Sequence, residues 1–151
     1  MIKIITVGSI KEKYLKDAIE EYSKRLSKYT NLELIEVKDE GLVEPKKAIY
    51  QEAEKILKHI GEKDYIITLE IDGKELNSIE LADKINKISQ EASTIIFIIG
   101  GSYGLSEIIK NKSKFHLSFS KMTFPHQLFR VLLLEQIYRA YKINNNESYH
   151  K

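Results

Sequence analysis

The feature that most constrains the fold is a regular alternation of short apolar runs with longer segments whose apolar residues recur at helical spacing. One of these runs, from Thr94 to Ile99, is apolar almost without interruption. Such a run is typical of a strand inside a sheet that is covered on both faces. Strands that alternate with helices normally form a parallel sheet. We therefore expect an α/β fold, with a mainly parallel sheet between helix layers.

The alternation can be written as five strands and five helices. Ser78 and Thr123 are candidate helix caps, and Pro45 and Pro125 suit the first turn of a helix. The predicted strands are Ile2 to Val7, Leu32 to Val37, Tyr65 to Ile71, Thr94 to Ile99 and Phe115 to Phe119. The predicted helices carry Tyr14 to Tyr29, begin at Pro45, at Ser78 and at about Ser106, and extend from Pro125 to about Ile143.

Composition limits the class of protein. The 151 residues contain no linker-like stretch, so we expect a single domain over residues 1–151. Cysteine is absent and the four histidines are scattered, which disfavours a metal site. No apolar segment approaches the roughly 20 residues that cross a bilayer, and the N-terminus lacks a signal-peptide pattern. A soluble cytoplasmic protein is expected, and the net charge of +2 names no partner.

Three loops follow the carboxyl ends of predicted strands, where open α/β sheets bind ligands. The second loop, Gly100 to Gly104, would let main-chain groups approach a ligand closely, although a simple tight turn explains its glycines equally well. It lacks the spacing of a phosphate-binding or dinucleotide-binding loop. An adenosine held by main-chain groups between apolar walls remains open, with walls supplied by Leu69, Phe119, Met122 and Phe124. Core burial is the alternative for these four side chains.

The segment from Ser118 to Arg130 is the strongest site candidate in the chain. It places several polar side chains around a helix start directly after a buried strand. His126 and Arg130 are four residues apart, so they should share one helix face and could address one polar or anionic substrate. A solvated first turn is the alternative.

The C-terminal helix and the tail each allow two interpretations. The helix is apolar on more than one face, which indicates either burial within the domain or a homodimer interface. The tail combines Tyr149, His150 and Lys151, and it is either a frayed terminus or a segment that folds over an RNA site.

Over essentially its full length, the chain resembles the RlmH-type ribosomal RNA methyltransferases of the SPOUT superfamily. The resemblance rests on KIITVGSIKEKY, ITLEIDGK, IIGGSYG, LSFSKMTFPHQLFRVLLLEQIYRAYKI and the final YHK. It implies a C-terminal trefoil knot, a homodimer, and methylation of N3 of a pseudouridine in 23S (large-subunit) rRNA with S-adenosylmethionine. It places the cofactor at Leu69, Gly100, Phe119, Ser120, Lys121, Met122, Thr123 and Phe124. The stretch Asn144 to Glu147 departs from the family pattern and leaves the tail geometry open.

Methyl transfer to an imide nitrogen requires loss of a weakly acidic proton and in-line attack on the methyl group. Orientation alone supplies roughly 7 to 11 kcal/mol, so no single base need be indispensable. We expect His126 and His150 to take part in proton transfer, and Arg130 and Tyr149 to orient the nucleotide. All four could instead only shape the pocket.

The competing hypotheses are a non-catalytic ribosome-binding or RNA-binding module with the same fold and a nucleotide-binding α/β enzyme of other chemistry. The resemblance favours a methyltransferase that acts on assembled ribosomes, and the composition disfavours a metal site and a membrane span.

Overall fold

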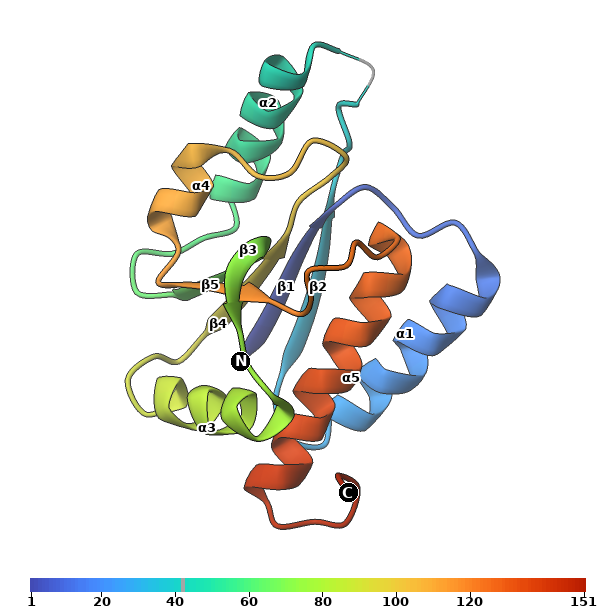
Figure 1. The fold of residues 1–151 in the computed structure, drawn as a ribbon, viewed down its shortest axis with the longest axis vertical. Coiled ribbons are helices and arrows are strands. Elements are labelled where there is room, and N and C mark those ends of the chain that lie inside the picture. The colour runs from blue at the N-terminus through green and yellow to red at the C-terminus, as the bar shows by residue number, and fades with distance from the viewer. Residues whose placement is uncertain (42) are drawn as a thin grey trace.

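The computed structural model describes residues 1–41 and 43–151. Five parallel strands form one sheet in the order β2-β1-β4-β3-β5 (Figure 1). The strands are β1 (Ile2–Val7), β2 (Leu32–Val37), β3 (Tyr65–Glu75), β4 (Ile95–Ile99) and β5 (Phe115–Ser118). The helices are α1 (Lys13–Leu26), α2 (Pro45–Leu57), α3 (Ser78–Ser89), α4 (Glu107–Lys112) and α5 (His126–Asn144). The predicted α/β class and all ten predicted elements are confirmed.

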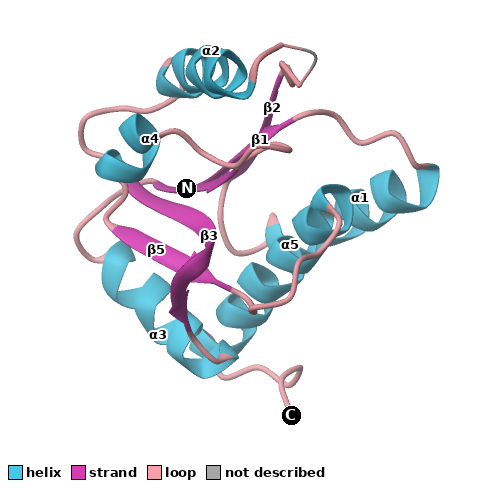
Figure 2. Cartoon of the chain, turned by 45° about the horizontal axis from the view of Figure 1, so that its top comes forward, coloured by secondary structure: helices cyan, strands magenta, loops and turns pink. Residues whose placement is uncertain are grey.

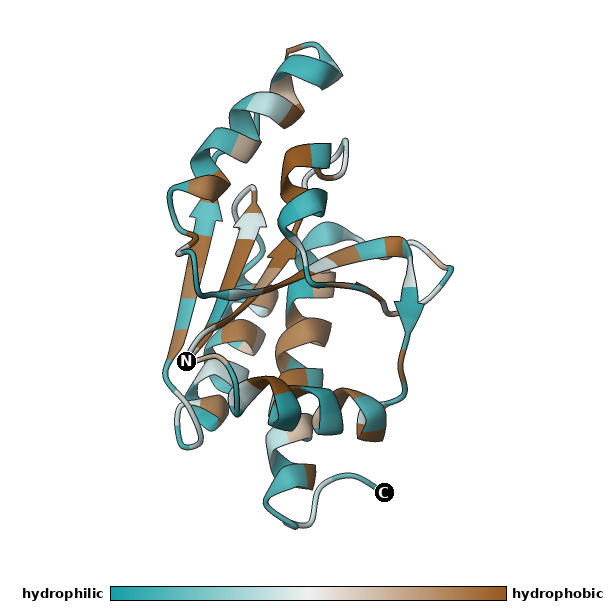
Figure 3. Cartoon of the chain, turned by 90° about the vertical axis from the view of Figure 1, so that its left-hand side faces the viewer, coloured by the Kyte–Doolittle hydropathy of each residue, from teal (hydrophilic) through white to brown (hydrophobic). Residues whose placement is uncertain are grey.

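Helices cover both faces of the sheet. α1, α3 and α5 pack on one face, and α2 and α4 lie on the other (Figure 2). Every residue of the central strand β4 is buried, because both of its neighbours and both helix layers surround it. Figure 3 shows hydrophobic residues, in brown, along the strands and alternating with hydrophilic ones along the helices. The trefoil knot that the resemblance implies stays a prediction.

Two predicted helix caps are wrong. Asn77, not Ser78, caps α3, because its side chain accepts a hydrogen bond from the Glu80 N–H while the Glu80 carboxylate accepts one from the Asn77 N–H. Pro125 is the residue that precedes α5, and no side chain caps that helix, so Thr123 has no capping role. The first turn of α5 therefore presents free backbone N–H groups at the carboxyl edge of the sheet.

Strand β3 is longer than the sequence predicts, since it runs past Asp72 and Gly73 to Glu75. Leu69 and Lys74 both pair with Leu117 of β5, so residues 70–73 form a bulge between them. After the bulge, β3 pairs with β5 again, and Gly73 allows this close approach because a Cβ there would lie 2.7 Å from the carbonyl oxygen of His116. The bulge carries Glu70 and Asp72 out of the sheet toward the carboxyl edge.

Candidate functional site

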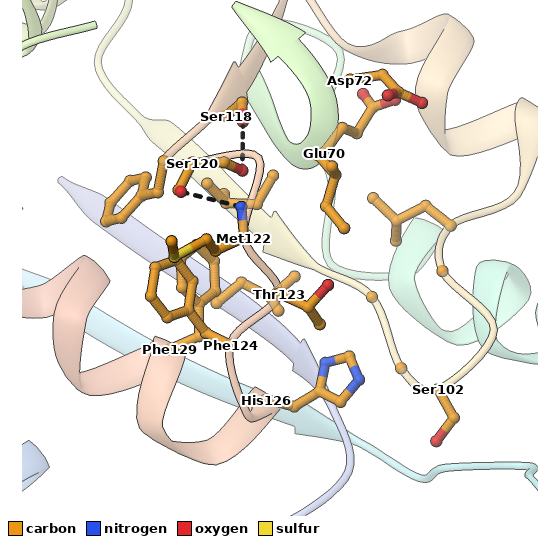
Figure 4. Close-up of a pocket in the computed structure, with 18 of the residues that line it drawn as sticks. Glu70, Asp72, Ser102, Ser118, Ser120, Met122, Thr123, Phe124, His126 and Phe129 are labelled. Carbon is orange, nitrogen blue, oxygen red and sulfur yellow. Dashed lines mark hydrogen bonds between the residues drawn. The ribbon is translucent and has the colours of Figure 1, made fainter. Parts of the chain in front are cut away.

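The carboxyl edge of the sheet holds a cavity of about 370 Å³, shown in Figure 4. Three segments line it: residues 69–72 of the β3 bulge, the glycine loop (residues 100–105) and the loop before α5 (residues 118–124). These are the loops after the predicted strands that end at Ile71, Ile99 and Phe119, where the sequence predicts a ligand site. The parallel sheet brings them together because β3 lies between β4 and β5.

The glycine loop forms one wall of the cavity at main-chain level. Gly104 has φ +82°, and a Cβ there would meet nothing within 4 Å, so its missing side chain leaves open space. Gly100 is packed instead, since a Cβ there would lie 2.8 Å from the backbone of Gly104. The tight turn is closed by a 3.0 Å hydrogen bond from the Gly104 N–H to the Gly101 carbonyl. The loop is thus both a tight turn and a cavity wall, so the two interpretations of its glycines are compatible.

Apolar side chains form the opposite wall. The Phe119 ring meets Phe129 edge to face at 4.9 Å, and Phe124 stacks on Phe129 at 5.9 Å between centroids. Phe119 and Phe124 are half-buried, whereas Met122 is 75% exposed at the rim. Leu69 completes the predicted set of wall residues, so all four line the cavity. A flat slot between apolar rings and a backbone wall suits a planar aromatic ligand.

The loop before α5 owes its shape to two serines. The Ser118 hydroxyl donates to the Ser120 carbonyl at 3.1 Å, and the Ser120 hydroxyl accepts from the Met122 N–H at 3.0 Å (Figure 4). Of the eight residues expected at the cofactor, Leu69, Gly100, Phe119, Ser120, Met122, Thr123 and Phe124 line the cavity. Lys121 is exposed and does not line it.

Two carboxylates at the rim were missed from the sequence. Glu70 and Asp72 line the cavity from the β3 bulge. Glu70 is held in place because its Oε2 accepts a 2.6 Å hydrogen bond from the buried Thr68 hydroxyl and contacts His116 Nδ1. Their position directly after a predicted strand was a usable signal. The two acids make this rim suited to a ligand that carries positive charge.

His126 and Arg130 lie on one helix face, as predicted, but their surroundings differ. His126 is exposed and lines the cavity near Ser102 and Thr123 (Figure 4). Arg130 is 6% exposed: it donates to Glu36 at 2.7 Å and to the carbonyls of Val7 and Gly8 at 3.0 and 2.9 Å. Burial lowers the pKa of Arg130, and the Glu36 carboxylate opposes that shift.

The Arg130 contacts tie α5 to the carboxyl ends of β1 and β2. Its buried Nε has no hydrogen-bond partner among residues 1–41 and 43–151. The predicted contact of Arg130 with a nucleotide stays a prediction. Its hydrogen bonds show that Arg130 also has a structural role.

Tyr149 and His150 lie at the other end of α5. The Tyr149 hydroxyl donates to Glu135 at 2.9 Å, its ring packs edge to face on Tyr138, and His150 Nδ1 lies 3.1 Å from the Arg139 guanidinium. Burial, with Glu135 second, raises the pKa of Tyr149 to about 12. The structure therefore packs the tail on Glu135 and Arg139, which lie roughly 14 and 20 Å along the axis of α5 from His126, and not at the cavity of its own chain.

A third missed residue is Glu52 of α2, which is 3% exposed beneath the glycine loop. Its Oε2 accepts a hydrogen bond from the Glu40 N–H at 2.9 Å, and a Cβ on Gly101 would lie 3.6 Å from its Oε1. Burial raises the pKa of the Glu52 carboxyl. Nothing in the sequence distinguished Glu52 from the other glutamates on α2, because its burial depends on the loop that packs over it.

Within residues 1–41 and 43–151, no group of three or more His, Cys, Asp and Glu side chains could hold a metal ion. In the same part of the chain, no helix is long and apolar enough to cross a membrane.

The fold and the cavity define an α/β protein with a cavity at the carboxyl edge of a parallel sheet. The chain matches the family described as "Predicted SPOUT methyltransferase" over residues 1–150. A relative from Methanococcus maripaludis is 59% identical over 157 aligned residues, which cover 99% of each chain. The chain belongs to the SPOUT methyltransferase family.

Further relatives carry a more specific name. The proteins named ribosomal RNA large subunit methyltransferase H in Bifidobacterium adolescentis and Caldicellulosiruptor saccharolyticus are 54% and 48% identical. The alignments cover 99% and 100% of both chains, respectively. Among solved structures, a probable methylase family protein from Haemophilus influenzae has a TM-score of 0.57 and 16% identity. That match covers 99% of this chain and 70% of the other, and it supports the fold alone.

Proposed function

We propose that this chain transfers a methyl group from S-adenosylmethionine to N3 of a pseudouridine in 23S rRNA, on the assembled ribosome in the cytoplasm. The observation that carries the proposal is the cavity between the glycine loop and the Phe119 to Phe124 loop. Membership of a methyltransferase family supports the reaction class. The names of relatives that are about half identical over the full chain support large-subunit rRNA as the substrate.

The cavity fits this cofactor on three counts. The open space at Gly104 lets the main chain approach an adenine, and Leu69, Phe119 and Phe124 supply apolar walls. Glu70 and Asp72 line the same cavity, and together they carry more negative charge than Lys110 beside them offsets, which would stabilise a sulfonium or ammonium group. When bound, S-adenosylmethionine supplies an electrophilic methyl group on a positively charged sulfur.

The task of the protein is then to hold the imide nitrogen in line with that methyl group and to remove its proton. His126 is placed for proton transfer because it is exposed at the mouth of the cavity. Tyr149 keeps its own proton at neutral pH, since its pKa is about 12, so it is not expected to act as a phenolate base, although it can hydrogen-bond or stack on a base. General-base assistance is worth roughly 10² to 10⁴-fold, so His126 is expected to matter without being indispensable.

We propose that the active unit is a homodimer. On α5, Leu128 is 39% exposed, and Val131 and Leu132 are only half-buried, so this helix keeps an incompletely covered apolar strip. In the structure the tail packs on Glu135, Tyr138 and Arg139 of its own chain and does not line the cavity. If Tyr149 and His150 act on the nucleotide, they act at the cavity of a second copy.

A methyl-transfer assay tests the proposal. Free 23S rRNA, large subunits and whole ribosomes that lack the modification are offered with S-adenosylmethionine, and the product nucleoside is identified by mass spectrometry. Methylated pseudouridine formed on ribosomes is the expected result. Sedimentation is expected to give twice the chain mass of 17.5 kDa. A chain that binds ribosomes but neither binds S-adenosylmethionine nor transfers methyl groups would instead be a non-catalytic ribosome-binding module.

A further inference from the structure

A second cavity, of about 600 Å³, opens beside the first and has no role in the site described so far. It lies where the ends of β1 and β2, the glycine loop and the first turn of α5 meet. It shares Gly101, Ser102 and His126 with the cofactor cavity. Ligands in the two cavities would therefore meet at these three residues.

The floor of this second cavity is rigid. Arg130 ties the carbonyls of Val7 and Gly8 to Glu36, and its charge is thereby satisfied by protein groups. The Lys11 N–H donates to Gln127 Oε1 at 3.1 Å, which leaves the amide N–H groups of Gln127 available. A preformed floor with free donors suits recognition of carbonyl oxygens, such as those of a pyrimidine base.

The rim of the second cavity carries positive charge that the protein does not neutralise. Lys11 and Lys38 are exposed, and neither has an ion-pair partner within 4 Å among residues 1–41 and 43–151. Asp39 is the carboxylate on that rim that is not bound to Arg130. Two free ammonium groups at the mouth of a polar cavity indicate a phosphate-bearing ligand.

A third cavity also adjoins the cofactor cavity, but it fits a nucleotide less well. It is more open, and its central lysine, Lys110, lies 3.9 Å from Glu70 and 3.8 Å from Glu107. His116 there contacts Glu70 as well. Lys74 and Lys114 also line the third cavity, but so do the three carboxylates of Glu70, Asp72 and Glu107, which oppose a phosphate. The second cavity is lined by two carboxylates, and one of them, Glu36, is paired with Arg130.

We propose that the second cavity binds the target nucleotide of the RNA, with Gln127 and Ser102 facing the base, and Lys11 and Lys38 holding the flanking phosphates. This inference rests on the proposed function for the reaction, but the binding it describes can be measured without cofactor. His126 lines both cavities, so it is placed beside the base to accept the imide proton that must leave before N3 attacks the methyl group.

Nucleotide binding is tested by nuclear magnetic resonance on the full-length protein without cofactor, with pseudouridine 5′-monophosphate as the probe. We expect the amide signals of Gly8, Ser9 and Ser102 to shift. Signals that shift only in residues 118–124 would place the nucleotide in the cofactor cavity and overturn the proposal, as would no shift at millimolar probe.

Kinetics on ribosomes provide the second test. The double variant Lys11→Ala/Lys38→Ala is expected to raise KM for ribosomes about tenfold or more, with kcat and cofactor affinity unchanged. The slope of log KM against log salt should fall by roughly 1 per lysine. The matched control is Lys58→Ala/Lys63→Ala, which removes two exposed lysines near the amino ends of the strands and should change nothing. Equal KM values for the two double variants would overturn the proposal.

The variant Ser9→Trp separates the two cavities, because Ser9 lines the second and not the first. We expect it to bind S-adenosylmethionine normally in calorimetry and to lose methyl transfer. Normal transfer would contradict the proposal, and loss of the dimer in sedimentation would show that the cavity is a subunit contact instead. A wild-type chain could fail to methylate ribosomes and still show the Gly8 and Ser9 shifts. That result would contradict the proposed methyltransferase function but would support the nucleotide site.

Discussion

The two ends of α5 differ in how many of their polar groups are bonded within the protein. The pocket end begins at His126, and the tail end lies near Asn144. At the pocket end, His126 is exposed, no side chain caps the helix, and two cavities meet. At the tail end, the Lys142 ammonium lies 3.0 Å from Glu147, and Glu147 also accepts from the Tyr29 hydroxyl at 3.0 Å. The pocket end is built to receive ligands, whereas the polar groups of the tail end are largely satisfied by one another.

The aromatic side chains show the same difference. Around the tail end, Tyr22, Tyr29, Tyr141 and Tyr149 all pack on or near Tyr138. Phe119 and Phe124 at the pocket end have one face on Phe129 and also line a cavity. Aromatic content alone therefore does not mark a binding site, because a ring acts on a ligand only where one face is left uncovered.

The largest expected effect is at the pocket end. Gly100→Val should abolish cofactor binding, because the new side chain would clash with the Gly104 backbone at 2.8 Å and displace the glycine loop. Calorimetry measures the affinity after circular dichroism has shown that the variant folds. Gly61→Val is the control, since a Cβ there meets only the flexible Asp64 side chain, at 3.1 Å. Undiminished affinity in folded Gly100→Val would move the cofactor elsewhere.

Removal of the tail should separate binding from turnover. Deletion of residues 148–151 is expected to leave cofactor affinity within a fewfold and to reduce single-turnover methylation by roughly 10² or more, since orientation and proton transfer are lost. Single-turnover kinetics on ribosomes provide the measurement. Near-normal turnover would mean that the tail only packs on its own chain, and a parallel fall in cofactor affinity would place it in the cofactor pocket.

The two arginines of α5 offer a direct comparison of stability. Arg130→Met should lower the free energy of unfolding by about 2 kcal/mol, because Glu36 and two backbone carbonyls lose their donor in a buried setting. Arg139→Met should cost only about 0.5 kcal/mol, since its pair with Glu135 is partly exposed. Urea unfolding measures the loss of free energy of unfolding for each variant. Equal losses would show that Arg130 at the pocket end contributes no more to stability than Arg139 nearer the tail end.

The smallest expected effect is a pH dependence at Glu52. Because burial raises its pKa above the ordinary 4.5, the folded protein holds this proton more tightly than the unfolded chain does. That contribution to stability is complete below pH 4.5 and is lost as the pH rises through the raised value. Glu52→Gln cannot titrate, so the wild type should lose stability relative to Glu52→Gln over this range. If the difference in free energy of unfolding between the wild type and Glu52→Gln stayed constant from pH 4 to 8, this would contradict a raised pKa of Glu52.

Much of the fold could be predicted because strands and helices leave different apolar periods. β4 was evident from IIFII, and α2 from Pro45 and the spacing that follows it. The bulge in β3 was not, since Asp72 and Gly73 resemble the end of a strand, and only the return of Lys74 to pair with Leu117 shows that the strand continues.

For the site, the sequence alone determined the three loops and their wall residues, because main-chain freedom at Gly104 and apolar side chains beside strand ends are local properties. The tertiary structure decided the rest. Glu52 is buried because a distant loop covers it, and Arg130 bonds groups more than 90 residues away. His126 and His150 look equivalent in the sequence, but His126 lines the cavity, whereas His150 contacts Arg139, more than three turns of α5 away. Burial, charge pairing and distance are properties of the packed chain, and no local pattern contains them.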